Sequence, residues 1–239
     1  MTGLILAAGS GSRLSESFGK DSCKPLVEIA GKPLIEYSLE NLFSAGVDRI
    51  YIVVGKQRER IENKIGVEYK GIPIFYAVQK QPVGLINAMA SALGEIDDDT
   101  VLQLSDEIFI ESISADLKSV FAESGADFLC GVTAESDEEK IKCNYSVEIN
   151  SDGELISCKE KPSEVSNSFK GTGFCVFSRK CIAKLRKEYD EEKNAPCDLC
   201  DFINLLIGEG YRGIITEIAK KEFNINTARD AALAKTQMI

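Results

Sequence analysis

Histidine is absent from this sequence of 239 residues, and its absence narrows the chemistry open to the chain. Histidine is the commonest general base in enzymes and the usual partner of a catalytic serine or cysteine. Any catalysis must therefore depend on carboxylates, lysines, arginines and a metal ion.

An excess of basic residues is absent as well. The sequence has 28 Lys and Arg against 38 Asp and Glu, which gives a net charge of -10. Proteins that bind nucleic acid need a basic surface, so this charge argues against a nucleic-acid partner. It does not argue against a nucleotide ligand, because a few local lysines and arginines can serve a triphosphate that arrives with Mg²⁺.

Long apolar runs are the third absence, since none approaches the length needed to cross a bilayer. The opening segment TGLILAAG has no basic residues before it and leads into a glycine turn. That arrangement indicates a buried strand rather than a signal peptide. We therefore expect a cytoplasmic protein with no membrane partner.

Cysteine is plentiful but lacks the spacing of a metal site. A zinc site needs a second close pair or histidines, and only Cys197 and Cys200 among the eight cysteines stand three positions apart. This pair lies late in the chain, whereas a redox CxxC motif usually opens a helix after an early strand. We expect buried, reduced cysteines.

The first 110 residues alternate between predicted strands and predicted helices, which indicates a parallel sheet with helices on both faces. Short apolar segments typical of buried strands lie at 4–8, 49–55, 74–78 and 100–104. Amphipathic helical patterns lie within 32–46, 58–65 and 84–93.

The pattern changes after residue 110. Strand-like segments lie at 127–132, 146–149, 155–159 and 173–177, followed by a helix at 199–207 and a strand-like stretch at 212–218. The turn Asn150-Ser151-Asp152-Gly153 predicts a hairpin. No linker or repeat interrupts the chain, so the sequence predicts one α/β domain over 1–239.

A glycine turn follows the first predicted strand directly. Gly9 and Gly11 allow the backbone to turn tightly, so that amide N–H groups can approach phosphate oxygens. The turn lacks the third glycine of a dinucleotide-binding motif and the Gly-Lys-Ser/Thr of a Walker A loop. Taken alone, it is also compatible with a sharp chain reversal that binds nothing.

Three segments of the first 55 residues together resemble the amino-terminal half of the sugar-phosphate nucleotidylyltransferases. They are LILAAGSGSRL, Lys24-Pro25-Leu26 and GKPLIEYSLENLFSAGVDRIYIVVG. This family includes glucose-1-phosphate thymidylyltransferases, UTP–glucose-1-phosphate uridylyltransferases and bacterial choline-phosphate cytidylyltransferases. The resemblance covers the first 55 residues almost without gaps. It implies a single-domain, Rossmann-like mixed sheet of the GT-A-like type, flanked by helices and carrying a small β-rich insertion for the acceptor. It also implies a nucleotide-binding half at 1–110 and an acceptor-binding half at 111–239.

The resemblance assigns roles to the glycine turn and to two basic residues. In the family the turn wraps the triphosphate, an arginine holds the β and γ phosphates, and a lysine stabilises charge at the α phosphate. By position these two are Arg13 and Lys24. A guanidinium fork can match two oxygens of a departing pyrophosphate. The expected nucleotide contacts of the turn are Leu6, Ala7, Ala8, Gly9, Ser10 and Gly11.

The segment from Gln79 through Gln81, Pro82 and Gly84 resembles the family's nucleobase-binding segment. A glutamine amide donates and accepts hydrogen bonds at once, as recognition of uracil, thymine or cytosine requires. We favour Gln81 over Gln79 for this role. The alternative is a loop that only leads into the helix at Gly84.

Asp106 ends the fourth predicted strand, where ligands bind in open α/β sheets. In the family an aspartate at this place ligates Mg²⁺. The resemblance implies a second ligand near the end of the chain, for which we favour Asn224, with Asn226 as the alternative. Asn226 or Thr227 could instead cap the helix that begins near Ala228, and the two roles could coexist.

The acceptor half matches the family less well. Glu160-Lys161-Pro162 matches a motif whose lysine grips the acceptor phosphate and whose glutamate holds a sugar hydroxyl. Ser146, however, replaces a glycine whose amide meets the sugar, and the segment around Thr172 departs from the family's Asn-x-Gly-Tyr contact. The resemblance therefore specifies the reaction more closely than it specifies the acceptor.

The resemblance implies an Mg²⁺-dependent enzyme that joins an NTP, with UTP or dTTP favoured, to a sugar 1-phosphate and releases pyrophosphate. A phosphate dianion is already nucleophilic, so no general base is needed. One alternative is a cytidylyltransferase for phosphocholine, a phosphonate or another non-sugar phosphate. Another is a non-catalytic nucleotide-binding subunit, against which the joint presence of Arg13, Lys24, Asp106 and Lys161 counts. A homo-oligomer is compatible with all three.

Overall fold

The computed structural model describes residues 1–9, 19, 22–81, 83–112, 117–191 and 198–238. Its first half builds four parallel strands, which are β1 (Thr2–Ala7), β4 (Arg49–Val54), β6 (Ile72–Val78) and β7 (Thr100–Leu104). β1 lies between β4 and β7, and β4 pairs with β6. Every residue of β1 is buried, as its unbroken apolar run predicts for a strand covered on both faces.

The second half of the chain adds strands to the edge of β7. These strands are β9 (Phe128–Ala134), β10 (Tyr145–Ile149), β11 (Leu155–Glu160), β12 (Phe169–Phe177) and β13 (Gly213–Glu217). β12 runs antiparallel to β7, β9 and β10, while β13 runs parallel to β9. β12 therefore joins the two halves into one mixed sheet.

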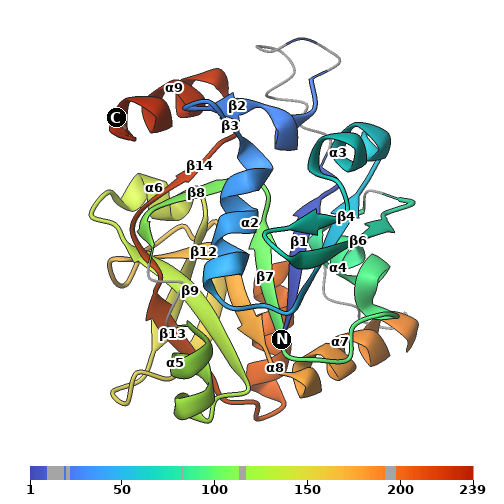
Figure 1. Ribbon diagram of the computed structural model, residues 1–239. Helices are drawn as coiled ribbons and strands as arrows, with labels where there is room; N and C mark the ends of the chain where they lie inside the picture. The colour runs from blue at the N-terminus through green and yellow to red at the C-terminus, as the bar shows by residue number, and fades with distance from the viewer. Residues whose placement is uncertain (10–18, 20–21, 82, 113–116, 192–197, 239) are drawn as a thin grey trace.

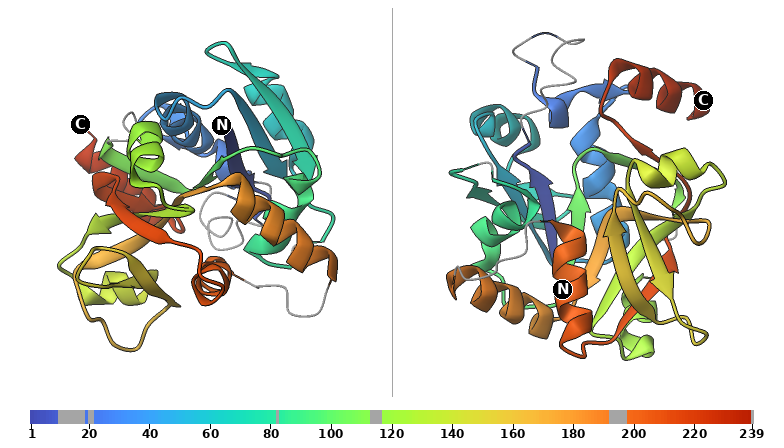
Figure 2. Two further views of the ribbon diagram at one scale, coloured as in Figure 1. Left: turned by 90° about the horizontal axis from the view of Figure 1, so that it is seen from below. Right: turned by 180° about the vertical axis from the view of Figure 1, so that it is seen from behind.

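The complete sheet has the strand order β11-β10-β12-β7-β1-β4-β6-β5, where β5 is Glu68–Tyr69, and β9 and β13 attach beside β12 (Figure 1). Helices α2 (Leu34–Ser44), α3 (Arg58–Ile65) and α5 (Leu117–Ser124) supply buried side chains to one face. Helices α4 (Leu85–Leu93), α7 (Arg179–Glu191) and α8 (Leu199–Gly208) supply them to the other. The two views of Figure 2 show α2 and α8 on opposite sides of the sheet.

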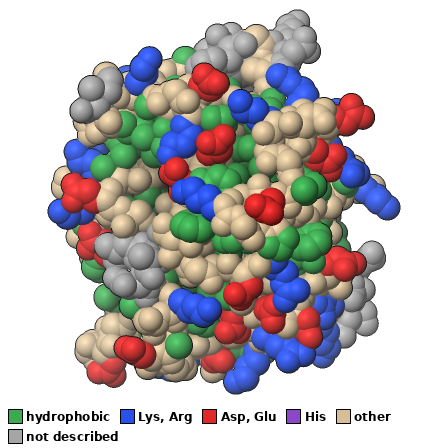
Figure 3. Space-filling view, in the orientation of Figure 1, with side chains coloured by type: hydrophobic (Ala, Val, Ile, Leu, Met, Phe, Trp, Pro, Cys, Tyr) green, Lys and Arg blue, Asp and Glu red, His purple; other side chains and the backbone are tan. Residues whose placement is uncertain are grey.

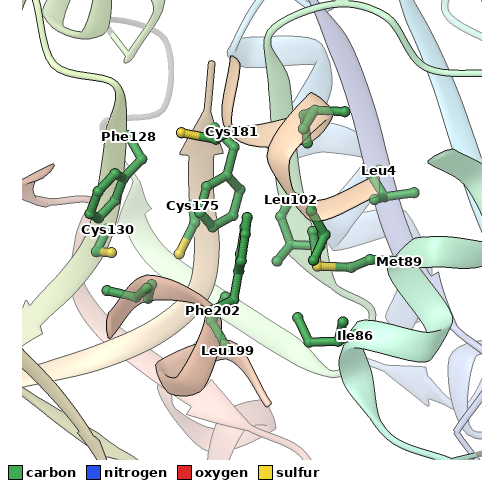
Figure 4. Packing of buried hydrophobic residues seen from close by; sticks show 14 of the residues in the cluster. Leu4, Ile86, Met89, Leu102, Phe128, Cys130, Cys175, Cys181, Leu199 and Phe202 are labelled. Carbon is green, nitrogen blue, oxygen red and sulfur yellow. The ribbon is translucent and has the colours of Figure 1, made fainter. Parts of the chain in front are cut away.

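The larger core lies on the face covered by α4, α7 and α8. Figure 4 shows Leu4 and Leu102 of the sheet packed against Ile86 and Met89 of α4, with Phe202 of α8 nearby. Cysteines take part in this packing, and Cys130, Cys158, Cys175, Cys181 and Cys200 are all buried and free.

The expected burial is confirmed for these five and for Cys23, whereas Cys143 is exposed. Cys143 lies just after the short helix α6 (Glu138–Lys142), at the surface of the second half. Cys197 lies outside the described residues.

A separate two-stranded sheet closes one end of the molecule. It pairs β8 (Glu107–Ser112) with β14 (Ala219–Asn224) and places Asn224 opposite Glu107. Helix α9 (Ala228–Gln237) follows and contributes Ala231 and Ala234 to a third apolar cluster with Ile108. The end of β14 is thereby held beside Glu107, the residue that follows Asp106.

The strands predicted in the first half are confirmed as β1, β4, β6 and β7, and the predicted hairpin at 150–153 joins β10 to β11. In that turn Asn150 Oδ1 accepts hydrogen bonds from the amides of Asp152 and Glu154, and Gly153 has a φ of 79°. The sequence patterns did not predict α7 or the ladder between β8 and β14. β8 begins with a buried glutamate and has only three consecutive apolar residues, so neither alternation nor a long apolar run marks it as a strand.

Acidic and basic side chains are interspersed on the face shown in Figure 3. In the described part of the chain, no helix is both long and apolar enough to span a membrane.

Candidate active site

The carboxyl ends of the parallel strands form the floor of the candidate site. β1 ends at Ala7, and the Ser105 amide after β7 donates a hydrogen bond to the Leu6 carbonyl at 3.3 Å. A Cβ atom on Gly55, just after β4, would lie 3.0 Å from the Ala8 carbonyl oxygen. The backbones of two strand ends therefore meet closely beside Gly9, at the edge where ligands bind in α/β sheets.

Three sequence-predicted nucleotide contacts after Gly9, namely Ser10, Gly11 and Arg13, lie outside the described residues. So does Pro82 of the predicted base-binding segment. Leu6 and Ala7 are buried in β1, while Ala8 is partly exposed and Gly9 is exposed. A ligand could therefore reach the main chain of the glycine turn at Ala8 and Gly9.

The two candidate glutamines have different surroundings. Gln79 is 9% exposed, and its Nε2 donates hydrogen bonds to the Gly84 carbonyl at 3.2 Å and to Asn87 Oδ1 at 2.9 Å. Gln81 is exposed. Gly84, the residue before α4, has φ 109° and ψ 175°, a conformation open essentially to glycine alone. The Gln79 amide holds this turn in shape, which leaves Gln81 available to a base.

Lys24 and Asp106 come from distant parts of the chain and form an ion pair. Lys24 begins the short 3₁₀ helix η1 (Lys24–Leu26), in which Pro25 is buried. Its Nζ lies 2.6 Å from Asp106 Oδ2, and the two side chains are 12% and 25% exposed. The same Nζ donates a hydrogen bond to Asn226 Oδ1 at 3.1 Å. The Lys24 ammonium group therefore contacts two other residues that the sequence predicted, namely Asp106 and the alternative metal ligand Asn226.

The segment between β14 and α9 positions Asn226. The Ile225 amide donates to the Asp106 carbonyl at 2.8 Å, which ties this segment to the end of β7. Asn226 Nδ2 donates to Asn224 Oδ1 at 2.7 Å, and this bond turns the Asn226 oxygen toward Lys24. The geometry therefore favours Asn226 over Asn224 as the residue that shares a cation with Asp106.

Thr227 caps α9, as the sequence suggested it could. Its side chain accepts a hydrogen bond from the Asp230 amide, and the Asp230 carboxylate accepts from the amides of Thr227 and Asn226. This reciprocal arrangement is a capping box. It fixes the backbone of Asn226 without using the Asn226 side chain, so capping and cation binding are compatible here.

The oxygens of Asp106 and Asn226 fit a divalent cation, because both already contact one positive group and Mg²⁺ prefers such oxygen ligands. Among the described residues, no cluster of three or more Asp, Glu, Cys or His side chains could hold a metal. Two protein oxygens leave most of an octahedral coordination shell to be filled by phosphates and water. The donor set therefore suits a metal that binds together with a phosphorylated ligand.

A layer of buried charged side chains lies beneath Asp106, and the sequence analysis did not identify it. Glu107 is 2% exposed, and its two oxygens accept hydrogen bonds from the Gly173 amide at 2.8 and 3.0 Å. Burial, together with the charges of Glu222 and Asp106, raises the pKa of Glu107 well above its usual range. This carboxyl group ties β12 to the start of β8, directly beside Asp106.

Lys170 of β12 and Glu222 of β14 form a buried ion pair in the same layer. Burial raises the pKa of Glu222, and the adjacent Lys170 ammonium partly offsets that rise. Buried charges persist in proteins when they are paired. A lysine inside the otherwise apolar pattern of β12 was the only sequence signal of this contact.

Glu160 and Lys161 lie together where β11 ends. Lys161 has a φ of 45°, and its amide donates to the Asn144 carbonyl at 2.7 Å. The side chain of Lys161 is 71% exposed, with its Nζ 3.7 Å from Glu160 Oε1. Partial burial raises the pKa of Glu160. An ammonium and a carboxylate are thus presented side by side to a ligand.

Ser146 and Thr172 are buried in the sheet. Ser146 is 6% exposed, and Thr172 is 1% exposed with its hydroxyl donating to the Gly131 carbonyl at 2.9 Å. The Thr172 carbonyl accepts a hydrogen bond from the Tyr145 hydroxyl at 2.8 Å. The hydroxyl and the carbonyl of Thr172 therefore both form hydrogen bonds within the sheet.

Comparison with known proteins shows what this arrangement resembles. The profile of a family described as nucleotidyl transferase matches residues 2–218. A UTP–glucose-1-phosphate uridylyltransferase of Haloferax volcanii is 34% identical over 179 residues, which cover 74% of this chain and 72% of that protein. A CMP-5'-(3-aminopropyl)phosphonate synthase of Streptomyces rubellomurinus is 31% identical over 150 residues, which cover 59% of this chain but only 24% of that protein.

A solved structure of a UDP-glucose pyrophosphorylase complexed with UDP-glucose has the same fold. The TM-score is 0.84 at 20% sequence identity, with 99% of this chain and 97% of the other covered. The predicted fold class, a mixed sheet of the GT-A-like type flanked by helices, is confirmed.

Proposed function

This chain belongs to the nucleotidyl transferase family, and from that premise we propose that it transfers a nucleotidyl group from UTP or dTTP to a sugar 1-phosphate. The products are a nucleotide sugar and pyrophosphate. The convergence of Lys24, Asp106 and Asn226 on one point at the end of β7 is the observation that carries this proposal. The Haloferax relative supports the choice of a uridine nucleotide and of glucose 1-phosphate as first substrates to try.

The acceptor phosphate attacks the α phosphorus of the nucleotide in line, and the bond to the leaving pyrophosphate breaks. No general base is required, because the phosphate dianion carries its own lone pairs. Lys161 holds the acceptor phosphate, and Glu160 accepts a hydrogen bond from a hydroxyl of the acceptor. Lys24 and Arg13 neutralise the charge that develops on the phosphates of the nucleotide.

Mg²⁺ held by Asp106 and Asn226 would neutralise charge on both phosphates. Asn224 acts on the same site indirectly, because its Oδ1 accepts from Asn226 Nδ2 and so orients the ligating oxygen. Gln81 contacts the base, while Gln79 maintains the turn at Gly84.

A cytidylyltransferase for a phosphonate or another non-sugar phosphate is the second candidate. The Streptomyces relative favours it, as does the internal hydrogen bonding of Thr172 in place of a free sugar contact. The reaction and the phosphate-binding residues are the same in both candidates, so only the acceptor and the base differ.

Pyrophosphate release measured with each NTP and a panel of acceptors tests the proposal. The panel holds glucose 1-phosphate, N-acetylglucosamine 1-phosphate, phosphocholine and 2-aminoethylphosphonate. We expect release with UTP or dTTP and a sugar 1-phosphate. Release with CTP and a non-sugar acceptor would select the second candidate. If no combination of NTP and acceptor releases pyrophosphate, the remaining function is that of a nucleotide-binding subunit.

The Asp106→Ala variant should lose about 100-fold or more in turnover, because the carboxylate that anchors the metal is removed. Steady-state pyrophosphate release measures the effect. Asp152→Ala is the matched control, since Asp152 is exposed in the turn between β10 and β11 and should keep the full rate. A near-normal rate for Asp106→Ala would refute the metal assignment.

A further inference from the structure

We propose that Lys24 is the counter-cation of the metal site in the nucleotide-free protein, so that a divalent metal binds only when a nucleotide draws Lys24 away. The inference rests on the proposed function, because it deepens the role of the same three residues. It concerns the order in which ligands enter the site rather than the reaction itself.

The first argument is geometric. Lys24 Nζ contacts Asp106 Oδ2 at 2.6 Å and Asn226 Oδ1 at 3.1 Å, so both protein oxygens that would ligate a metal already contact one ammonium group. A metal ion bound to the same two oxygens needs the position that this ammonium holds. The side chains of Lys24 and Asp106 are only 12% and 25% exposed, so water replaces their ion pair poorly and the pair is retained until another anion takes the place of Asp106.

The second argument concerns charge. Lys24 and Asp106 cancel one another and Asn226 is uncharged, so the three side chains together carry no net charge. A divalent cation placed beside the Lys24 ammonium would be repelled, since two positive charges a few Å apart interact strongly at a partly buried site. The nucleotide-free site therefore offers little net attraction to a metal.

A triphosphate removes this obstacle. It brings several negative charges of its own, which attract the Lys24 ammonium along the flexible four-carbon stem of the side chain. Asp106 and Asn226 then become available to the metal that accompanies the phosphates. Lys24 exchanges one anionic partner for another, and the metal takes its place beside Asp106.

Mn²⁺ binding to the nucleotide-free protein, followed by the electron paramagnetic resonance signal of free Mn²⁺, tests the proposal. We expect wild type to bind no more Mn²⁺ than Asp106→Asn does. Lys24→Met should bind Mn²⁺ about tenfold or more tightly than wild type, and Lys24→Met/Asp106→Asn should lose that gain. Lys24→Arg, which keeps the positive charge, should remain weak.

The matched control is Lys32→Met. Lys32 is also a partly buried lysine paired with a carboxylate, Glu40, and its loss removes the same charge away from the site. We expect its Mn²⁺ affinity to equal that of wild type. An equal gain in Lys32→Met and Lys24→Met would reduce the effect to net charge and overturn the proposal.

Wild type alone can also refute the inference, whether or not Lys24→Met folds. Tight Mn²⁺ binding by the nucleotide-free wild type that disappears in Asp106→Asn would show that Lys24 does not exclude the metal. With the α,β-imido analogue of UTP or dTTP, wild type should form a ternary Mn²⁺ complex that Asp106→Asn does not form. If these results hold but no NTP and acceptor release pyrophosphate, the proposed function fails and the inference on Lys24 stands.

Discussion

Gln79 and Gln81 are separated by one residue, yet their amides have different surroundings. Gln79 Nε2 donates to the Gly84 carbonyl and to Asn87 Oδ1, whereas Gln81 is exposed. Removal of a buried amide lowers the free energy of unfolding more than removal of an exposed one. The reason is that the buried groups that bonded to it are left without a hydrogen-bond partner. The two glutamines therefore separate stability from substrate binding.

Gln79→Ala should lower the free energy of unfolding by about 1–3 kcal/mol, because the Gly84 carbonyl and Asn87 lose their donor. Gln81→Ala should change stability by less than about 0.5 kcal/mol and instead raise the KM for the nucleotide. Urea denaturation and steady-state kinetics measure the two effects. The opposite pattern would mean that Gln79, and not Gln81, contacts the base.

Gly84→Ala should cost about 1–3 kcal/mol and raise the KM for the nucleotide, because φ 109° is strained for alanine and the turn before α4 must shift. Thermal denaturation and kinetics measure both effects. Gly94→Ala at the other end of α4 is the control, since Gly94 has a helical φ of -59° and open space around it. An unaffected Gly84→Ala variant would show that this conformation is not required.

At the scale of elements, the buried pair of Lys170 and Glu222 connects β12 to β14, and thereby the main sheet to the segment that carries Asn226. Lys170→Met should cost about 3–5 kcal/mol, because Glu222 would be left buried without its partner. Lys170→Met/Glu222→Leu should cost much less. Urea denaturation of the two variants measures the difference, and a Lys170→Met cost below about 1 kcal/mol would contradict it.

The elements differed in how well the sequence predicted them. β1 and β4 each contain a continuous apolar run that leads to a glycine, so their burial is predicted from the local sequence alone. β8 and β14 carry Glu107, Glu222 and Asn224 on one face, and the partners of these polar side chains lie outside the two strands, in β12, in β7 and at Asn226. A pattern that depends on partners distant in sequence cannot be recognised from either strand alone.

The same dependence on residues distant in sequence decided which parts of the site could be predicted. Lys24 and Asp106 were identified from their sequence surroundings, and the structure brings them together. The preference between Asn224 and Asn226 could not be decided from sequence, because both amides lie in one short segment and only the bond between them shows which oxygen is left to face Lys24. The burial of Thr172 likewise depends on the Gly131 carbonyl of another strand.

At the scale of the whole molecule, β12 pairs with β7 through residues 175–177, with β10 through Lys170, and with β9 through residues 169–171 and 175–177, so the two halves share one sheet. We therefore expect the protein to unfold in one cooperative transition. Far-ultraviolet circular dichroism and tyrosine fluorescence followed through the same urea titration should give coincident curves. Two separate transitions would show that residues 1–110 and 111–239 fold independently.

The ladder between β8 and β14 also has a consequence for biosynthesis. Asn226 reaches Lys24 only after β14 has paired with β8, so a nascent chain that ends at β13 contains Lys24 and Asp106 but lacks their third partner. Domains fold as units while the chain emerges from its amino terminus. The three residues of the site can thus come together only once residues 219–226 have been synthesised, more than a hundred positions after Asp106.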